Sequence, residues 1–503
     1  MGGKKNIPDN PMLKSTPLAK LGTGVYGLDD VLNGGYPDGR TTLLKGGPGA
    51  GKTLFSLQFL HQSALKGIPG IFVTFEESTD AIRMNAATLG WDFRALEKKG
   101  LLFIHYAKMN PSDIIAGPFS LKALMAILDG KCKAIGAKQL AIDAIDVLMR
   151  RFEDSPRVRD ELNALHEWLD ENRYTCLLSV KSSDDPAISA RFSFLDYMAD
   201  CAIVLDHRMM EQISTRRLRV VKYRGSGFGT NEYPYIIGTN GISLVPIASV
   251  ALVHRALGPH RSTGKKDFDE ALDGGYRRGA CILITGPSGA GKTTIACSLV
   301  QTACARGEKV LFISYEESPE ALESSVRSAG IKLKPALRSG NLKIISRLPE
   351  RMGADEHLFF DLLTIRSFQP DLVAVDAISA CNRMGSGKAP FDYLMRLVNT
   401  CKEQGITCVL NNQMRSSAAD VDLSGLGFSS LVDTVIQLRF EEIQSELKRS
   451  LVVLKARGSK HSPRFHDLRI TDNGIVLDSS KISAASAKSE RSSRTPRATG
   501  GAR

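Results

Sequence analysis

Short apolar runs alternate along the chain with longer stretches in which apolar positions recur at helical spacing. In the first half, the runs that predict strands are residues 70–75, 101–106, 139–145, 175–180 and 201–205. Two more runs, 42–45 and 281–285, each precede a glycine-rich loop and an amphipathic segment, 54–65 or 295–303. This alternation predicts an α/β fold in which helices cover both faces of a mostly parallel sheet. Ligands of such sheets bind beyond the carboxyl ends of the strands.

The second half of the chain repeats the first. LDDVLNGG at 28–35 aligns with FDEALDGG at 268–275, and FVTFEES at 72–78 aligns with FISYEES at 312–318. The repeat predicts two tandem copies of one domain, each long enough for its own core. The expected parts are an N-terminal arm at 1–14, a first domain at 15–247, a linker at 248–261, a second domain at 262–480 and a tail at 481–503.

Each half contains a phosphate-binding loop of the pattern G-x-x-x-x-G-K-[ST], GGPGAGKT at 46–53 and GPSGAGKT at 286–293. The glycines let backbone N–H groups face phosphate oxygens, the lysine reaches the β- and γ-phosphates, and the hydroxyl contacts Mg²⁺. A single match can be a chance turn in a chain with 45 glycines, but strand, loop and helix coincide in both copies. The predicted ATP contacts are Gly47, Gly49, Ala50, Gly51, Lys52, Thr53 and Leu54 in the first domain and Ser288, Gly289, Ala290, Gly291, Lys292, Thr293 and Thr294 in the second.

Paired carboxylates follow one apolar run in each copy, Glu76 with Glu77 and Glu316 with Glu317. Such a pair can orient or deprotonate a nucleophile beside a γ-phosphate, and the two groups titrate together, so the sequence does not fix which one is the base. A favourable charge at a helix N-terminus is the alternative explanation. Because both pairs accompany a phosphate-binding loop, we expect them to be catalytic.

Single aspartates end another apolar run in each copy, Asp143 in the first and Asp376 in the second. A carboxylate at this place holds Mg²⁺ directly or through water in ATPases with this loop. Capping of the following turn is a weaker alternative. The predicted Mg²⁺ ligands are therefore Thr53, Asp143, Thr293, Glu316 and Asp376.

A K-x-R-G-S pattern also occurs in both copies, after a small net deletion in the second, and gives Lys222 with Arg224 and Lys455 with Arg457. Two cations at i and i+2 of a strand project from the same face and can grip a triphosphate. Each half already has a loop lysine, so these extra cations can serve the γ-phosphate of a neighbouring subunit, as an arginine finger does. Solvated hairpin charges are the alternative.

Composition describes a globular protein: 43% of its 503 residues are hydrophobic, without an apolar run of membrane-spanning length or a secretory signal. Nine cysteines without a C-x-x-C pair suit a reducing compartment, so we expect a cytoplasmic location. The net charge of +12 is concentrated partly in the tail at 481–503. A basic balance permits nucleic-acid binding. A Ser-rich charged end is more typical of a solvated disordered tail, so nucleic acid is not the expected partner.

The two loops, the F-x-E-E, A-I-D and K-x-R-G motifs together resemble the KaiC family of circadian-clock ATPases, within the RecA-like superfamily, over about residues 18–477. The resemblance implies two tandem RecA-like domains that bind ATP and Mg²⁺ and form a homohexamer with ATP between subunits. It implies a slow ATPase in the first domain, where Glu76 or Glu77 activates water. In the second domain it implies an autokinase that also removes its own phosphates, where Glu316 or Glu317 activates a neighbour's hydroxyl. It adds Thr88 and Ser328 to the ATP contacts.

The resemblance also assigns the phosphoacceptors. Residues 198–205 align with 431–438, and just before them the first half has Asp-Tyr where the second has Ser429 and Ser430. This serine pair falls on the family's two acceptor positions, and Ser424 is a more distant candidate. Without the resemblance, two serines before a strand are as well explained by a turn.

Several residues depart from the family pattern. Ala329 stands where the family has a base-stacking tryptophan, and Phe228 replaces a histidine that His461 retains in the second copy. The segment after Leu477 lacks the family's regulatory C-terminal sequence. An activator of the KaiA type is therefore not expected, whereas a KaiB-like or other signalling partner is compatible.

The leading hypothesis is a hexameric ATPase and serine autokinase that acts as a signalling or clock-like timing component. A DNA-dependent motor of the RecA or DnaB type is an alternative, but it needs a basic nucleic-acid-facing surface, and no cluster of basic and aromatic residues is evident in the two halves. A third hypothesis is a nucleotide-gated scaffold, in which ATP only holds rings together.

Overall fold

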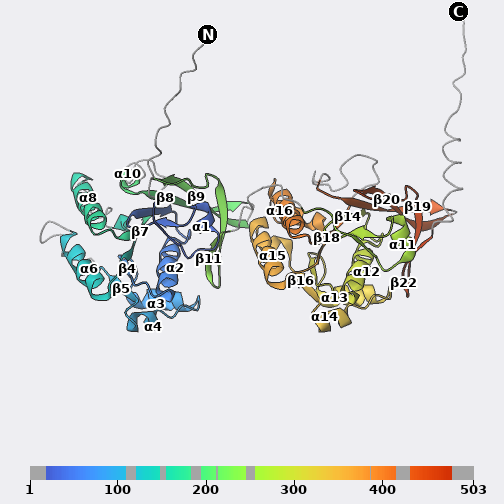
Figure 1. Cartoon of the computed structure of the whole chain (residues 1–503), viewed down its shortest axis with the longest axis horizontal. Coiled ribbons are helices and arrows are strands. Elements are labelled where there is room, and N and C mark those ends of the chain that lie inside the picture. The colour runs from blue at the N-terminus through green and yellow to red at the C-terminus, as the bar shows by residue number, and fades with distance from the viewer. Residues whose placement is uncertain are drawn as a thin grey trace, which may run out of the picture. The chain divides into compact units, whose positions relative to one another are not determined.

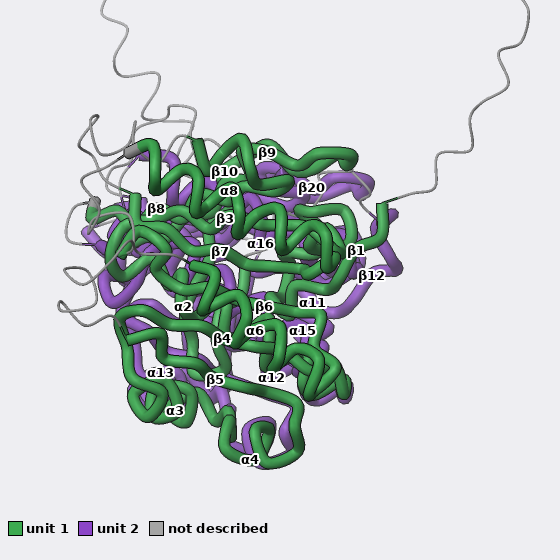
Figure 2. Tube along the Cα trace, turned by 90° about the vertical axis from the view of Figure 1, so that its left-hand side faces the viewer, with its two compact units in different colours: residues 1–209, 215–246 green, residues 210–214, 247–503 purple. Residues whose placement is uncertain are grey.

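The computed structural model describes residues 18–108, 121–147, 155–182, 194–210, 213–244, 255–385, 387–414, 431–443 and 445–478. The chain divides into two compact units, one of residues 1–209 and 215–246 and one of residues 210–214 and 247–503 (Figure 2). Figure 1 colours the first unit from blue to green and the second from yellow to red.

The first unit begins with short elements that lead into the phosphate-binding loop. Its elements are β1 Lys20–Leu21, α1 Leu28–Val31, β2 Tyr36–Pro37, β3 Thr41–Gly46, α2 Lys52–Leu65, β4 Gly70–Thr74, α3 Thr79–Ala87, α4 Phe93–Lys98, β5 Leu102–Tyr106, α6 Lys122–Ile135, β6 Gln139–Asp143, α8 Ser155–Glu171, β7 Thr175–Lys181, α10 Leu195–Met198, β8 Cys201–Met210, β9 Ile213–Tyr223, β10 Glu232–Gly238 and β11 Gly241–Leu244. The strands and the loop-following helix expected from the apolar pattern are all present.

The second unit repeats this order. Its elements are β12 His260–Arg261, α11 Lys266–Ala271, β13 Tyr276–Arg277, β14 Cys281–Gly286, α12 Lys292–Ala305, β15 Val310–Ser314, α13 Pro319–Arg327, α14 Lys334–Ser339, β16 Leu342–Ser346, η1 Pro349–Arg351, α15 Ala354–Phe368, β17 Leu372–Asp376, η2 Ile378–Arg383, α16 Ala389–Gln404, β18 Thr407–Gln413, β19 Thr434–Ile443, β20 Glu446–Ala456, β21 His466–Thr471 and β22 Gly474–Asp478.

Within the described residues, each unit is built on one nine-stranded sheet. The strand order is β11-β10-β9-β8-β3-β7-β6-β4-β5 in the first unit, and the second unit has the same topology, β22-β21-β20-β19-β14-β18-β17-β15-β16. The strands from β8 to β5 and from β19 to β16 are parallel, whereas β20 to β22 are antiparallel. The prediction of an α/β fold with a mostly parallel sheet is confirmed.

Helices pack on these sheets through alternate strand residues, because successive side chains of a strand point to opposite faces. In the first unit, Leu43 of β3 belongs to a core with Leu128 of α6 and Leu162 of α8. In the second unit, Ile282 of β14 belongs to a core with Ile295 of α12 and with side chains of α11, α13 and α14. Since Leu43 aligns with Leu283 in the repeat, these two cores lie on opposite faces of the common sheet.

The turns after β4 and β15 are fixed by capped helices. Ser78 accepts a hydrogen bond from Ala81 N at the start of α3, and Ser318 accepts one from Ala321 N at the start of α13. A serine cap of this kind contributes about 1 kcal/mol to a helix. Both turns carry the paired glutamates, so the caps fix the backbone just after them.

All nine cysteines are buried and none forms a disulfide. Among the described residues, no helix is long and apolar enough to cross a membrane.

Candidate active sites

Each phosphate-binding loop ends in a glycine at which a helix begins. Gly51 (φ 82°) precedes α2, Gly291 (φ 101°) precedes α12, and no side chain caps either helix start. The first N–H groups of both helices are therefore left for another acceptor, and such helix starts attract anions. The positive φ of both residues favours glycine, and an added Cβ would also lie 3.0 Å from Ile237 Cδ1 at Gly51 and 2.8 Å from Ile470 Cδ1 at Gly291.

The two loop lysines are folded back onto their loops. Lys52 Nζ donates to the carbonyl oxygens of Gly46 at 2.8 Å and Gly47 at 3.0 Å. Lys292 Nζ donates in the same way to Gly286 at 3.0 Å and to the carbonyl of the next residue at 2.8 Å. Burial lowers the pKa of both amines, and nearby carboxylates oppose that shift. Each cation is thus already held inside the loop that would surround a phosphate.

The strand-end aspartates contact the loop threonines. Thr53 Oγ1 donates to Asp143 Oδ2 at 2.7 Å, and Thr293 Oγ1 donates to Asp376 Oδ2 at 2.6 Å. The second oxygen of Asp143 accepts a hydrogen bond from Ser179 Oγ at 2.5 Å. Burial raises the pKa of both aspartates, and the threonine hydrogen bonds oppose this shift.

This donor set fits Mg²⁺. Hydroxyl and carboxylate oxygens are its preferred protein ligands, and it usually keeps one or two of them together with water and phosphate oxygens. In the described part of the chain, no group of three or more histidine, cysteine or acidic side chains is arranged to hold a metal. Phosphate and water would therefore complete the coordination at Thr53 with Asp143 and at Thr293 with Asp376.

The second glutamate of each pair is tied to the helix that follows it. Glu77 Oε2 accepts a hydrogen bond from Asn85 Nδ2 of α3 at 3.0 Å, and Glu317 Oε2 accepts one from Ser325 Oγ of α13 at 3.2 Å. Burial raises the pKa of Glu77, and the charge of Asp143 raises it further. These two carboxylates are thus anchored to the helices that follow them.

The first glutamate of each pair interacts electrostatically with the loop lysine. Glu76 and Glu316 have exposed side chains, and neither forms a hydrogen bond or ion pair with another described residue. Their charges oppose the burial-lowered pKa of Lys52 and Lys292. Burial raises the pKa of Asp376, and Glu316 adds to that rise. Glu316 therefore lies near both the loop lysine and the predicted metal ligand.

The predicted first-unit cations lie at the end of β9 and in the turn that follows it, beside the start of β8. Lys222 Nζ donates to the carbonyl oxygen of Asp196 at 2.5 Å, and Arg224 Nη2 donates to that of Tyr197 at 3.0 Å. Burial lowers the pKa of Lys222, and the charge of Arg224 lowers it further. The two cations are thus held close to one another by backbone carbonyls.

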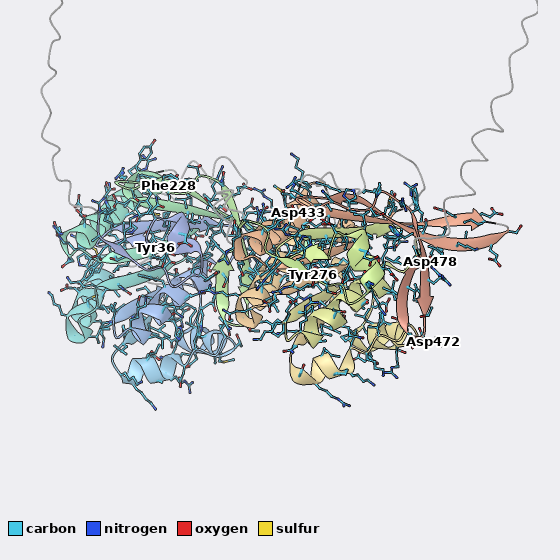
Figure 3. All side chains as sticks on the ribbon, turned by 45° about the vertical axis from the view of Figure 1, so that its right-hand side comes forward. Tyr36, Phe228, Tyr276, Asp433, Asp472 and Asp478 are labelled. Carbon is cyan, nitrogen blue, oxygen red and sulfur yellow. The ribbon has the colours of Figure 1, made fainter. Side chains whose placement is uncertain are left out.

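The second-unit cations occupy the same place beside β19. Lys455 Nζ donates to the carbonyl oxygen of Val432 at 2.6 Å, and Arg457 Nη1 lies 3.4 Å from Asp433 Oδ1. Asp433, labelled in Figure 3, is only 3% exposed and also accepts a hydrogen bond from the backbone N–H of Cys281. Burial lowers the pKa of Lys455, and Arg457 adds to this.

Both cation pairs lie beside the amino-terminal ends of the parallel strands. This is the edge of the sheet opposite to the phosphate-binding loop of their own unit, which follows the carboxyl end of β3 or β14. β3 and β8 are parallel, with Thr42 opposite Cys201 and Gly46 opposite Leu205. The loop follows Gly46, whereas the cations adjoin the start of β8, and four strand residues span about 13 Å. β14 and β19 have the same register. A cation of either unit therefore does not reach the loop of that unit.

Two arginines that sequence reasoning missed also contact the loops. Arg216 Nε donates to the carbonyl oxygen of Gly49 at 3.3 Å, and Arg449 Nε donates to that of Gly289 at 3.1 Å. Each comes from the long hairpin strand, β9 or β20, six positions before the predicted lysine. Their recurrence at one place in both copies was the available signal.

The remaining predicted residues divide into three groups. Gly49 and Gly289 have positive φ, Ala50 and Ala290 are buried, and Gly47, Leu54, Ser288 and Thr294 lie in the loops or the first helical turns. Thr88 and Ser328 end α3 and α13, and each hydroxyl donates to a carbonyl of its own helix, at 2.7 and 2.9 Å. Ser429, Ser430 and Ser424 lie outside the described residues.

The residues that depart from the family pattern are buried or half-buried. Ala329 is buried, at 5% exposure, just after α13. Phe228, labelled in Figure 3, and His461 are both half-buried in the segments that follow the cation turns.

A duplicated parallel sheet in which each copy has a lysine loop, a threonine–aspartate contact and a glutamate turn defines a tandem P-loop ATPase. The family described as "ATPase: KaiC" matches residues 21–249 and again 261–482. The chain is 37% identical over 468 residues to the circadian clock protein KaiC2 of a Synechocystis species, covering 92% of this chain and 82% of that protein. It is 32% identical to the circadian clock oscillator proteins KaiC of Parathermosynechococcus lividus, over 93% of this chain and 88% of the relative, and of Synechococcus elongatus, over 91% and 88%. The chain belongs to the KaiC family of ATPases.

Proposed function

We propose that this KaiC-family protein is a Mg-ATP-dependent homohexamer that hydrolyses ATP in its first unit and phosphorylates its own Ser429 and Ser430 in its second. The second unit would also remove these phosphates. The phosphorylation state would report on time or on a signal to a KaiB-like or other signalling partner.

The observation that carries the proposal is the position of the cations. Lys222, Arg224, Lys455 and Arg457 all lie at the sheet edge remote from the loop of their own unit. A neighbouring copy can bring a loop to that edge, and an arginine supplied in this way contributes about 10³–10⁵ to the rate of phosphoryl transfer. The arrangement favours sites that are completed between subunits.

The proposed phosphoacceptors directly precede, in the sequence, the segment that holds the second cation pair. Ser430 is two residues before Val432, whose carbonyl holds Lys455. In this proposal, the two serines receive phosphate beside the second cation pair. A hydroxyl in this place suits transfer from the ATP of a neighbouring copy.

The reaction follows from these positions. A serine Oγ attacks the γ-phosphorus, the bond from that phosphorus to the bridging β–γ oxygen breaks, and ADP leaves. The hydroxyl proton passes to a carboxylate, and we assign this task to Glu316, because Glu317 is engaged with Ser325. Thr293 and Asp376 would hold Mg²⁺, which would neutralise charge on the phosphates. In the first unit Glu76 has the equivalent place and water is the nucleophile.

Incubation of purified protein with ATP labelled in the γ-phosphate tests the proposal. We expect label on Ser429 and Ser430 by mass spectrometry, and loss of label in the Ser429→Ala, Ser430→Ala double variant. Glu316→Gln should suppress labelling while phosphate release by the first unit continues. Ser325→Ala is a matched control that alters only the anchor of the second glutamate.

Other outcomes select other functions. Label that persists in the double variant removes these acceptors. Hydrolysis that is strongly stimulated by single-stranded DNA and falls steeply with salt supports a motor. Rings that assemble with ATP but neither hydrolyse it nor become labelled support a nucleotide-gated scaffold.

A further inference from the structure

A fully buried carboxylate lies behind the glutamate turn of the second unit. Asp361 of α15 has no exposed surface, and its Oδ1 accepts a hydrogen bond from Arg347 Nη1 at 2.6 Å. Its Oδ2 accepts hydrogen bonds from Tyr393 Oη at 2.9 Å and Tyr315 Oη at 3.3 Å, and the two phenol oxygens are 2.8 Å apart. We call these four residues the Asp361 cluster.

The Asp361 cluster joins four elements at one place. Tyr315 follows β15, Arg347 follows β16, and the other two members lie on α15 and α16. Arg347 N also donates to the carbonyl of Ser314, the last residue of β15, at 3.1 Å. His357 packs edge-on against the Tyr315 ring, with centroids 5.5 Å apart. Tyr315 is therefore held by its hydroxyl, by its ring and through the neighbouring strand.

Tyr315 is the residue directly before Glu316. Its backbone N–H donates to the carbonyl oxygen of Asp376 at 2.7 Å, and the side chain of Asp376 contacts Thr293 of the loop. The backbone that carries Glu316 is thus fixed on one side to the predicted metal ligand and on the other to the Asp361 cluster. A displacement of Tyr315 moves the adjoining carboxylate, because consecutive Cα atoms are about 3.8 Å apart.

The first unit has apolar residues at the two equivalent strand ends. Phe75 aligns with Tyr315, and Ala107, whose N–H donates to the carbonyl of Thr74, takes the place of Arg347. Phe75 is 7% exposed and contributes to the hydrophobic core under α6 and α8. Neither residue can hydrogen-bond through its side chain. The polar anchor at Tyr315 and Arg347 is therefore a property of the second unit.

Buried carboxylates are costly unless all their oxygens are paired, and their partners must then hold good geometry. In the Asp361 cluster both oxygens are paired, and burial raises the pKa of Asp361 while Arg347 opposes the rise. A member that moves out of place leaves a buried polar group short of a hydrogen bond, which costs free energy. An apolar contact such as that of Phe75 tolerates small displacements more easily.

We propose that the Asp361 cluster positions Glu316 for phosphoryl transfer to a serine, and that the apolar residues Phe75 and Ala107 at the equivalent places of the first unit separate the two activities. The inference rests on the proposed function and deepens it. Both nucleophiles must attack in line with the leaving oxygen, but water is free to move into that position, whereas a serine is tethered to its own chain. A base that serves the serine must be held correspondingly closely, since a misplacement of about 1 Å can lower a rate roughly 10²-fold.

The test replaces Tyr315 by the residue that the first unit has. With Tyr315→Phe we expect the rate of serine labelling at saturating ATP to fall roughly 10-fold, because Glu316 loses its anchor. The ATP concentration for half-maximal labelling should stay within about 2-fold, since the loop contacts are unchanged. Phosphate release by the first unit in the same sample should not change.

Two further variants separate positioning from general damage. Tyr276→Phe is a matched control, because Tyr276 (Figure 3) is also a buried second-unit tyrosine whose hydroxyl bonds an arginine, Arg306, at 2.8 Å. It should label at the parent rate. Tyr393→Phe should lower the rate as Tyr315→Phe does, and the double variant should lose less than the product of the two losses, because both act through one carboxylate.

The outcomes are distinguishable. A parent protein without serine label overturns the proposed function and the inference with it. A labelled parent with an unchanged rate in Tyr315→Phe overturns only the inference, as does a loss no larger than that of Tyr276→Phe or a loss with equally weakened ATP dependence. If Tyr315→Phe does not fold, Tyr393→Phe decides by the same criteria.

Discussion

The two units hold nearly the same cradle in different surroundings. The lysine-to-carbonyl distances span 2.8–3.0 Å in both, and the threonine–aspartate distances are 2.7 and 2.6 Å. The differences begin at the residue directly before the paired glutamates. At this position Phe75 packs in a hydrophobic core, whereas Tyr315 contacts a buried carboxylate. The phosphate-binding loop thus determines that a nucleotide can bind, and the elements packed behind it can determine which reaction the nucleotide undergoes.

The aspartate beside the cation turn shows a second difference. In the first unit Asp200 pairs with Arg40 at 3.2 Å, and the arginine side chain is 38% exposed. In the second unit Asp433 pairs with Lys402 at 2.9 Å, and both side chains are less than 10% exposed. The second unit therefore places a buried ion pair directly behind the segment that leads to its serines, where the first unit has a solvated one.

The largest expected effect concerns the trans cations. Arg457→Ala should lower serine labelling about 10³-fold or more, as removal of an arginine finger does. When these copies are mixed with Lys292→Ala copies, label should return and appear on the Lys292→Ala chains. The Lys292→Ala chains retain the serines and the cations, and their Arg457→Ala neighbours supply an intact loop. Tagged chains of different size allow the two to be counted separately.

Arg469→Ala is the control for that experiment, because Arg469 is a half-exposed arginine of β21 in surface ion pairs with Asp467 and Asp478. It should label normally. Full labelling by Arg457→Ala alone, or label confined to chains with an intact loop, would contradict sites shared between subunits.

The buried and the solvated ion pairs predict a difference in stability. Lys402→Met should lower the free energy of unfolding by about 3 kcal/mol, because it leaves the Asp433 carboxylate short of a partner in the core. Arg40→Met should lower it by less than about 1 kcal/mol, since exposed pairs contribute little. Methionine keeps most of the apolar stem in both variants. Urea unfolding of the full chain measures both, and equal losses would remove this distinction between the units.

Acid should destabilise the second unit because it protonates His357. Burial lowers the pKa of His357 from 6.5 to about 4. Between these values the unfolded chain binds a proton that the folded chain does not, so the stability contribution is complete above pH 6.5 and is lost as the pH falls toward 4. The loss should reach about 2–4 kcal/mol at pH 4.

Substitution of His357 gives the measurement. His357→Gln removes the titrating ring and keeps a donor for the carbonyl of Pro349, which now receives the ring Nε2 at 3.1 Å. The free energy of unfolding should then fall less steeply between pH 6.5 and 4 than in the parent. An unchanged pH slope would show that other groups dominate acid unfolding.

Much of this arrangement follows from local pattern. Apolar runs with alternating helices predict the sheet, and the repeat predicts its duplication, because each strand and loop carries its own signal in a few adjacent residues. The contact between Thr53 and Asp143 was also predictable. Thr53 follows β3, Asp143 ends β6, and the carboxyl ends of parallel strands lie at the same edge of a sheet. The contacts behind the site are different in kind.

The members of the Asp361 cluster come from separate elements, and each alone is an ordinary core or surface residue. Tyr315 and Arg347 are brought together only by the pairing of β15 with β16, and Asp361 and Tyr393 only by helix packing. Arg216 of β9 contacts Gly49 of its loop across a separation of 167 residues in the sequence. No periodicity marks such residues, so tertiary structure is needed to find them.

The smallest expected effect lies in the cradle itself. Gly47 has no atom within 4 Å of an added Cβ and no positive φ, and the second unit carries Pro287 at the equivalent position. Gly47→Ala should therefore change the free energy of unfolding by less than about 1 kcal/mol, with a small gain from the stiffer unfolded chain. Gly46→Ala is the contrasting variant, because its Cβ would lie 2.7 Å from the carbonyl oxygen of Leu205, so a clear loss is expected. If thermal unfolding showed equal losses for the two variants, the first loop would tolerate a side chain less well than the second, and the cradles would differ after all.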